Sequence, residues 1–169
     1  AFKSKLLELL QDTNEKTTSK VVFCIHKSVV ECLKGMCEDL NISHAVINGE
    51  TAVKKRAPIV AKFQAGEIDV LICSIKAAGV GLTMTRSNNV ILAESSWVPG
   101  LNQQAIDRCH RIGQTKTVYV DRVFCNSSID QFIQQCEKGK KKMHKLLLKH
   151  LKQKKTNKNS IKCYLNAKT

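Results

Sequence analysis

Residues 20–25 read KVVFCI and residues 69–73 read DVLIC, and both are short apolar runs rich in β-branched side chains. Runs of this length between polar segments predict buried strands. Comparable apolar runs lie at residues 43–47, 89–93 and 117–124. The sequence therefore predicts a sheet of about five or more strands.

Segments with a helical spacing of apolar residues separate these strands. They lie at residues 2–11, 28–40, 53–65, about 100–110 and 128–136. Ser28 and Thr51 are candidate N-caps, and Gly66 is a candidate helix stop. An alternation of strands and helices is typical of a parallel sheet with helices on both faces, so the predicted fold class is α/β.

Ligands of parallel sheets bind beyond the carboxyl ends of the strands. Polar or glycine-containing segments follow four of the predicted strands, at residues 26–27, 48–51, 74–83 and 94–100. The last of these leads into the segment QQAIDRCHRIGQ at residues 103–114. The sequence therefore predicts a single functional edge of the sheet.

The segment 103–114 carries two arginines three residues apart. On a helix, Gln104, Arg108 and Arg111 fall at positions i, i+4 and i+7, so they share one face. Two guanidinium groups and an amide suit an anionic, oxygen-rich ligand such as a phosphate chain. The alternative is a solvated helix face on which Asp107 pairs with Arg111.

Residues 74–83, SIKAAGVGLT, combine two glycines with small and hydroxyl side chains directly after a strand. Such a segment exposes backbone N–H groups to an anion, although Gly79 and Gly81 could also do no more than shape a turn. The chain contains no G-x-x-x-x-G-K-[ST] loop and no acidic pair ending a strand. It therefore lacks the lysine cradle and the magnesium ligands that nucleotide hydrolysis needs.

A chain of 169 residues with 43% hydrophobic residues suits one domain with an ordinary core. Its net charge is +14, and twelve lysines with only one acidic residue lie between residue 137 and the C-terminus. A basic protein suggests a polyanionic partner. Most of this charge lies in one extension, however, and such an extension could also be merely solvated.

The eight cysteines include no CxxC pair and no Cys/His arrangement with zinc spacing, so no metal site is predicted. Several lie within apolar runs, which predicts buried, reduced thiols in a reducing compartment. The chain has no signal peptide and no apolar run long enough to cross a membrane. A soluble intracellular protein with no membrane partner is expected.

The segments SIKAAGVGLT, VILAESSWVP and QQAIDRCHRIGQ, in this order, resemble the C-terminal RecA-like lobe of Swi/Snf-type ATP-dependent DNA translocases, a branch of superfamily-two helicases. The form AAGVGLT, with Ala-Glu before the tryptophan segment, is most similar to the annealing-helicase, HARP-like branch. The resemblance covers residues 3–142. It implies a leading helix and linker at 1–19, a RecA-like lobe at 20–136 and a basic, helical brace extension at 137–169.

The resemblance also implies roles for single residues. Arg111 is implied to be the arginine finger that reaches the γ-phosphate of ATP, with Arg108 assisting it. Gln104 and Gly79 are implied to lie at the nucleotide. ATP and Mg²⁺ are implied to be held mainly by an N-terminal RecA-like lobe of the same parent chain. The residues implied to contact DNA are Gly49, Thr51, Arg56, Ser74 and Trp97.

Two positions depart from the pattern of the family. Residues 48–51 read NGET where many relatives have Asp-Gly-Ser-Thr, and an acid at Glu50 is unfavourable beside a phosphate. Residues 97–99 read WVP instead of Trp-Asn-Pro, so one hydrogen-bonding amide is lost. An alternative role for Trp97 is that of a core anchor.

The function implied by the resemblance is that of the second motor lobe of a double-stranded DNA translocase, of chromatin-remodelling or strand-annealing type, in the nucleus. Because the phosphate-binding loop and the magnesium ligands are absent, the chain alone is expected to hydrolyse nothing. Two alternatives stay open on the sequence. One is the C-terminal lobe of an RNA helicase, and the other is a non-enzymatic basic module that binds nucleic acid.

Overall fold

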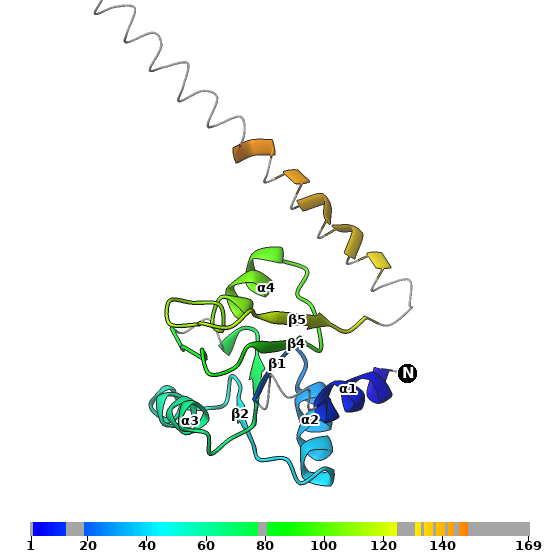
Figure 1. Cartoon of the computed structure of the whole chain (residues 1–169). Coiled ribbons are helices and arrows are strands. Elements are labelled where there is room, and N and C mark those ends of the chain that lie inside the picture. The colour runs from blue at the N-terminus through cyan, green and yellow to red at the C-terminus, as the bar shows by residue number, and fades with distance from the viewer. Residues whose placement is uncertain are drawn as a thin grey trace, which may run out of the picture. The chain divides into compact units, whose positions relative to one another are not determined.

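Five short strands pair in parallel to form one sheet (Figure 1). Their order across the sheet is β2-β3-β1-β4-β5. The central strand β1 is buried along its whole length, which explains why it is continuously apolar after Lys20. The strands are β1 (Lys20–Cys24), β2 (His44–Ile47), β3 (Val70–Ser74), β4 (Asn89–Leu92) and β5 (Tyr119–Arg122).

The computed structural model describes residues 2–12, 19–77 and 81–124, and parts of the segment 131–148. The chain divides into two compact units, Ala1–Ser127 and Ser128–Thr169. The sheet belongs to the first unit. The boundaries predicted at residues 19/20 and 136/137 stay predictions.

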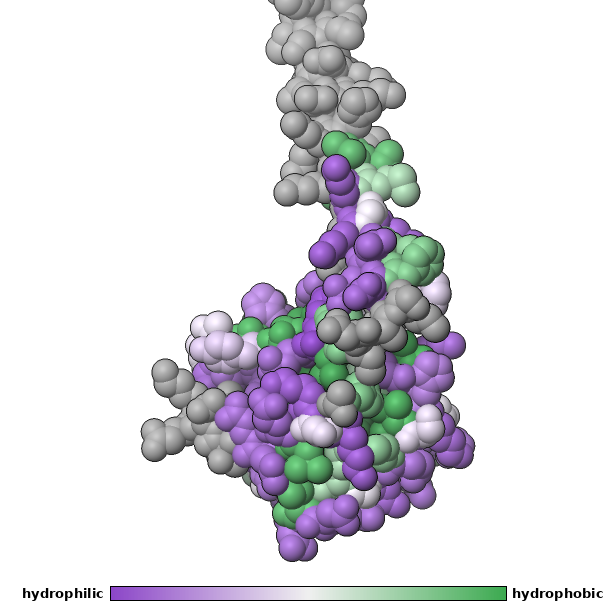
Figure 2. Space-filling view, turned by 90° about the vertical axis from the view of Figure 1, so that its right-hand side faces the viewer, coloured by the Kyte–Doolittle hydropathy of each residue, from purple (hydrophilic) through white to green (hydrophobic). Residues whose placement is uncertain are grey.

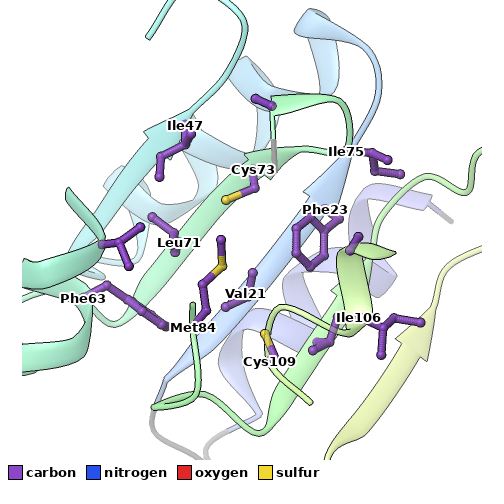
Figure 3. Packing of buried hydrophobic residues seen from close by; sticks show 14 of the residues in the cluster. Val21, Phe23, Ile47, Phe63, Leu71, Cys73, Ile75, Met84, Ile106 and Cys109 are labelled. Atoms are coloured by element: carbon purple, nitrogen blue, oxygen red, sulfur yellow. The ribbon is translucent and has the colours of Figure 1, made fainter. Parts of the chain in front are cut away.

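Two helices pack on each face of the sheet. Leu33 of α2 packs in one core with Val22 of β1, whereas Phe63 of α3 packs in the other core with Phe23 of β1. Adjacent residues of a strand point to opposite faces, so β1 contributes to both cores. Figure 3 shows Phe63, Phe23 and Met84 within the second core. The helices are α1 (Phe2–Gln11) and α2 (Lys27–Asp39) on the first face, and α3 (Val53–Ala65) and α4 (Pro99–Ile106) on the second.

The predicted α/β fold class is confirmed, and the elements differ from the prediction mainly at their ends. Gly66 ends α3 with a φ of 94°, as a helix stop does. No side chain caps α2 or α3, so the predicted caps Ser28 and Thr51 are wrong. The Thr51 hydroxyl bonds to Asn48 instead. Helix α4 ends at Ile106, earlier than predicted.

In the second unit, the described residues between 131 and 148 are helical. Phe132 and Met143 are exposed there, as are the three leucines at 146–148. Figure 2 shows hydrophobic and hydrophilic residues side by side on the described part of this segment. Among the described residues of the whole chain, no helix is long and apolar enough to cross a membrane. The same residues contain no group of three or more His, Cys, Asp or Glu that could hold a metal ion.

Among the described cysteines of the first unit, four are buried free thiols, as the sequence predicts: Cys24, Cys37, Cys73 and Cys109. Burial raises the pKa of Cys24 and Cys109 to about 12 and that of Cys37 to about 11. It also raises the pKa of Cys73 well above its usual range. These thiols therefore stay protonated in the folded protein, which makes them poor nucleophiles.

Replacement of Cys109 by alanine tests this burial. The Cys109 pKa rises from 9.0 to about 12 on folding, so a shift from pH 8 to pH 10 ionises the thiol only in the unfolded chain. Ionisation lowers the free energy of unfolding by about 1.4 kcal/mol. Urea unfolding should therefore show that Cys109→Ala costs about 1.4 kcal/mol less at pH 10 than at pH 8. Buried Val30, which has no titratable side chain, serves as the control: Val30→Ala should show no such difference, and an equal cost of Cys109→Ala at both pH values would contradict the burial.

Candidate functional site

The carboxyl ends of β1, β2 and β3 surround a surface hollow of about 410 Å³, which we name the strand-edge hollow. Parallel pairing in register aligns these strand ends, so segments far apart in the sequence meet there. Three of the predicted DNA-contacting residues, Gly49, Arg56 and Ser74, lie together in its lining. The residues of the lining that carry polar or open backbone groups are Lys27, Asn48, Gly49, Glu50, Arg56, Ser74 and Lys76.

The turn after β2 is held by the side chain of Asn48. Its Oδ1 accepts hydrogen bonds from the backbone N–H of Glu50 at 3.0 Å and of Thr51 at 3.1 Å, and from the Thr51 hydroxyl at 3.1 Å. The Thr51 hydroxyl, which was predicted to contact a DNA phosphate, is therefore already bonded within the turn. A Cβ built on Gly49 meets no atom within 4 Å, so the missing side chain leaves the backbone open to a ligand.

Arg56 is only 8% exposed, although it lines the strand-edge hollow. Its guanidinium donates to the carbonyl of Thr51 at 2.9 Å, of Asn48 at 3.3 Å and of Ala77 at 3.5 Å. These bonds tie the segment after β2 to the segment after β3. They favour a role for Arg56 in holding the edge of the hollow, and its direct contact with DNA stays a prediction.

An ion pair lies at the strand-edge hollow. Lys27 Nζ is 2.7 Å from Glu50 Oε1, and the side chains are 67% and 69% exposed. The hydrogen bond to Glu50 raises the pKa of Lys27. Exposed pairs contribute little to stability, so the consequence is electrostatic. Glu50 offsets the charge of one of the basic side chains that a phosphate would meet.

The arginine segment is arranged differently from the prediction. Helix α4 ends at Ile106, and the chain continues through turns and bends at residues 107–113. Arg108 and Arg111 therefore lie beyond the helix, and the predicted helical face is wrong. The helix ends here because the Arg108 carbonyl accepts the N–H of Met84 at 2.9 Å, which draws the chain toward another segment. Asp107 accepts a hydrogen bond from the Gln103 side chain at 2.9 Å.

Gln104, Arg108 and Arg111 nevertheless meet at a second hollow of about 580 Å³, which we name the arginine hollow. Arg111 is exposed, and its Nη1 donates to the Thr83 hydroxyl at 3.2 Å. The lining contains three cationic side chains and only one carboxylate, so the hollow suits phosphate oxygens. The charged and amide residues of the lining are Gln104, Asp107, Arg108, Arg111, Gln114 and Lys116.

Trp97 lies in the loop between β4 and α4 and lines neither hollow. Its side chain is 50% exposed, so it does not act as a core anchor. Asn102 of α4 holds this loop, because its Oδ1 accepts the Ser96 N–H at 2.7 Å and its Nδ2 donates to the Ser96 carbonyl at 3.0 Å. Asn102 is fully buried, and it places the loop that carries Trp97.

Gly79 lies outside the described residues, so its place at the nucleotide stays a prediction. Sequence reasoning missed the residues that position the site. One is Asn102, and another is Glu94, whose Oε2 accepts the N–H groups of Ile25 and His26 at 2.8 Å each. Glu94 thereby joins the end of β4 to the end of β1. Such side chains leave no local signal, because their partners are distant backbone groups.

The five-stranded parallel sheet with helices on both faces is the architecture of a RecA-like lobe, and a cationic hollow lies at its arginine segment. The chain belongs to the family described as the helicase conserved C-terminal domain, which matches residues 2–113.

Named relatives agree with this assignment. An uncharacterized ATP-dependent helicase of Mycoplasma genitalium is 34% identical over 143 residues, which are 84% of this chain and 14% of that protein. The chromatin-remodeling ATPase INO80 of Homo sapiens is 37% identical over 103 residues, which are 60% of this chain and 7% of that protein. The crystal structure of the C-terminal part of the Fun30 ATPase domain superposes with a TM-score of 0.75 at 30% identity, covering 79% of this chain and 44% of that one.

These comparisons confirm the Swi/Snf-type family and the RecA-like fold that the sequence predicts. They do not confirm the HARP-like branch. The chain spans 14% and 7% of the two full-length relatives, so it corresponds to a small part of each.

Replacement of Asn102 by leucine tests how the Trp97 loop is held. Leucine has a similar size but leaves the Ser96 N–H and carbonyl without their buried partner, at a cost of about 2–4 kcal/mol in the free energy of unfolding. Trp97 is the only tryptophan of the chain, so its fluorescence reports on the loop. Asn102→Leu should increase quenching of Trp97 by acrylamide. The control Gln103→Leu, at an exposed neighbour, should leave quenching unchanged; equal quenching in both variants would show that Asn102 does not hold the loop.

Proposed function

We propose that the chain is the second motor lobe of an ATP-dependent double-stranded DNA translocase of chromatin-remodelling or strand-annealing type. The observation that carries this proposal is the arginine hollow, where Gln104, Arg108 and Arg111 converge. The chain itself has no loop to hold the phosphates that these side chains suit. Membership in the helicase C-terminal family supports the proposal, as do relatives named ATP-dependent helicase and chromatin-remodeling ATPase.

In this mechanism, ATP would be held by an N-terminal RecA-like lobe of the same parent chain, together with Mg²⁺, which would offset the charge of the phosphates. Closure of the two lobes brings Arg111 to the γ-phosphate. Negative charge on the oxygens of the transferring phosphoryl group is then stabilised by the guanidinium. The exposure of Arg111 suits this role, since the side chain can reach a ligand outside its own lobe. Half-buried Arg108 supports it, and Gln104 and Gly79 lie at the nucleotide.

DNA is held at the strand-edge hollow and by the Trp97 loop. The open backbone at Gly49, the hydroxyl of Ser74 and the basic side chains of Lys27 and Lys76 suit the phosphates of a strand. Such contacts do not depend on the base sequence. Arg56 holds the edge of the hollow and, with Thr51, completes the predicted contact surface. Reopening of the lobes after hydrolysis moves the strand by one step.

The proposed function and its two alternatives predict different stimulation of turnover. A double-stranded DNA translocase is stimulated by duplex DNA, whereas the lobe of an RNA helicase is stimulated by RNA and a non-enzymatic module by neither. The relative named as a chromatin-remodeling ATPase supports the double-stranded DNA translocase and a nuclear location.

Replacement of Arg111 by alanine in the parent protein tests the arginine-finger role. DNA-stimulated ATP hydrolysis should fall by about 10³–10⁵-fold, because the charge on the phosphoryl group is no longer offset. Binding of duplex DNA, measured by fluorescence anisotropy, should stay within about twofold, since the contacts with DNA phosphates lie elsewhere. Lys34→Ala, at an exposed position of α2, is the control and should keep full turnover. Residues 1–169 alone should hydrolyse no ATP, and loss of both turnover and DNA binding in Arg111→Ala would indicate a folding role.

Replacement of Glu50 by glutamine tests the place of the DNA strand. The change removes a negative charge from the strand-edge hollow and releases Lys27 from its ion pair. Affinity of residues 1–169 for duplex DNA should rise by about threefold to tenfold, and the plot of log K against log salt should steepen by about 0.9, as for one more phosphate contact. Glu38→Gln removes an equal charge from an exposed position on α2. If both variants bind DNA equally, the strand does not pass the strand-edge hollow.

A further inference from the structure

Hydrogen bonds join the arginine segment to the segment that precedes β4. The Met84 N–H donates to the Arg108 carbonyl at 2.9 Å, and Arg111 Nη1 donates to the Thr83 hydroxyl at 3.2 Å. Met84 and Cys109 are fully buried in the same core (Figure 3). The base of the arginine segment is therefore fixed by packing as well as by hydrogen bonds.

The tip of the arginine segment lacks such packing. Ile112 is 100% exposed, and Arg111 is also exposed. Gly113 has a φ of 102°, a conformation that turns the chain back and that other residues adopt at a cost. Hydrophobic contacts of Ile112 within the described residues thus do not hold Arg111 in place. The tip is therefore held in place by hydrogen bonds at the two ends of the turn.

Gln114 stands at the far end of this turn and bonds to both segments. Its Nε2 donates to the carbonyls of Thr85 at 2.9 Å, Ser87 at 2.9 Å and Cys109 at 3.3 Å. Its Oε1 accepts the N–H of Lys116 at 3.0 Å. One amide therefore closes the turn that carries Arg111 onto its own start at Cys109 and fastens it to the segment before β4.

The backbone adds to this closure at the arginine itself. The N–H of Gln114 donates to the carbonyl of Arg111 at 2.9 Å. The residue that bears the guanidinium is thus bonded directly to the residue whose side chain anchors the turn. A displacement of Gln114 moves the Arg111 backbone with it.

We propose that Gln114 is a positioning residue for Arg111, and that the hydrogen bonds donated by its side-chain amide hold the guanidinium in the position required for the γ-phosphate. This inference rests on the proposed function, in which Arg111 acts across the lobe interface. A misplacement of about 1 Å in such a group can lower turnover by about 10²-fold. Gln114 therefore acts on the rate of the chemical step through Arg111, with little effect on the affinity for ATP or DNA.

Donation to three carbonyls can also be supplied by an ammonium group, and the chain contains an example. Lys20 Nζ donates to the carbonyls of Leu9 at 2.7 Å, Leu10 at 2.8 Å and Asp12 at 2.6 Å at the end of α1. Lysine at position 114 can therefore restore the donated bonds, whereas glutamate has nearly the same shape as glutamine but only accepts. These two substitutions distinguish the effect of the donated hydrogen bonds from the effect of the side chain's shape.

The experiment compares Gln114→Glu, Gln114→Lys and the control Gln11→Glu in the parent protein. In Gln114→Glu, kcat for DNA-stimulated ATP hydrolysis should fall by about 10–100-fold, while KM for ATP and the affinity for duplex DNA change by less than about twofold. Gln114→Lys should recover kcat to within about fivefold of the wild type. Gln11→Glu adds the same charge at an exposed position of α1 and should keep full turnover. Hydrogen exchange measured on residues 1–169 should show that the backbone N–H of residue 114 exchanges faster in Gln114→Glu only.

Several outcomes would overturn the inference. Wild-type kcat in Gln114→Glu would show that the donated bonds are dispensable. Failure of Gln114→Lys to recover kcat would show that donation is not what the site requires, and this variant decides the matter if Gln114→Glu does not fold. Arg111→Ala distinguishes the two levels of the argument. Full turnover in Arg111→Ala would defeat the proposed function itself, whereas loss of turnover there with normal turnover in Gln114→Glu would defeat only the role of Gln114.

Discussion

Parallel pairing of five short strands in one register is the constraint on which the rest of the structure depends. Backbone hydrogen bonds continue past the strands, since the N–H of Ile75 donates to the carbonyl of Cys24 at 2.9 Å and that of Ala93 to the carbonyl of Phe23 at 2.9 Å. The segments after β1, β3 and β4 are therefore neighbours before any side chain contributes. A shift by one residue would turn the apolar side chains of β1 to the wrong faces, so the two cores also protect the geometry of the site.

The sheet could be predicted from the sequence because its strands are short apolar runs separated by helical patterns. The order of the strands could not, because the pairing of β1 with β3 and β4 is set by contacts between distant segments. The ends of the helices were also beyond local patterns. Thr51 has the side chain of an N-cap, but Asn48 engages its hydroxyl in the preceding turn. A side-chain hydrogen bond of this kind competes with capping.

The chemistry of the site was easier to predict than its geometry. The guanidinium groups of Arg108 and Arg111 suit phosphate wherever they lie, so the composition of the segment was sufficient to single them out. Their placement on a helix was wrong, because the Arg108 carbonyl bonds to Met84 in another segment. The importance of Asn102 and Gln114 was missed for the same reason. The side-chain amides of Asn102 and Gln114 bond to backbone groups of other segments, and no residue spacing in the sequence records which groups they will meet.

The two hollows are joined by one stretch of chain. The carbonyl of Ala77 is held by Arg56 at the strand-edge hollow, and the hydroxyl of Thr83 is held by Arg111 at the arginine hollow. On the proposed function, a DNA strand that binds at the strand-edge hollow therefore acts near Ala77. Ala77 is covalently connected to Thr83, which contacts the arginine finger. Coupling between sites requires a contiguous element that both sites bias. The closely packed core beneath β1 and β3 resists deformation, so coupling on the proposed function depends on the hydrogen bonds that hold Ala77 and Thr83 rather than on a movement of the sheet.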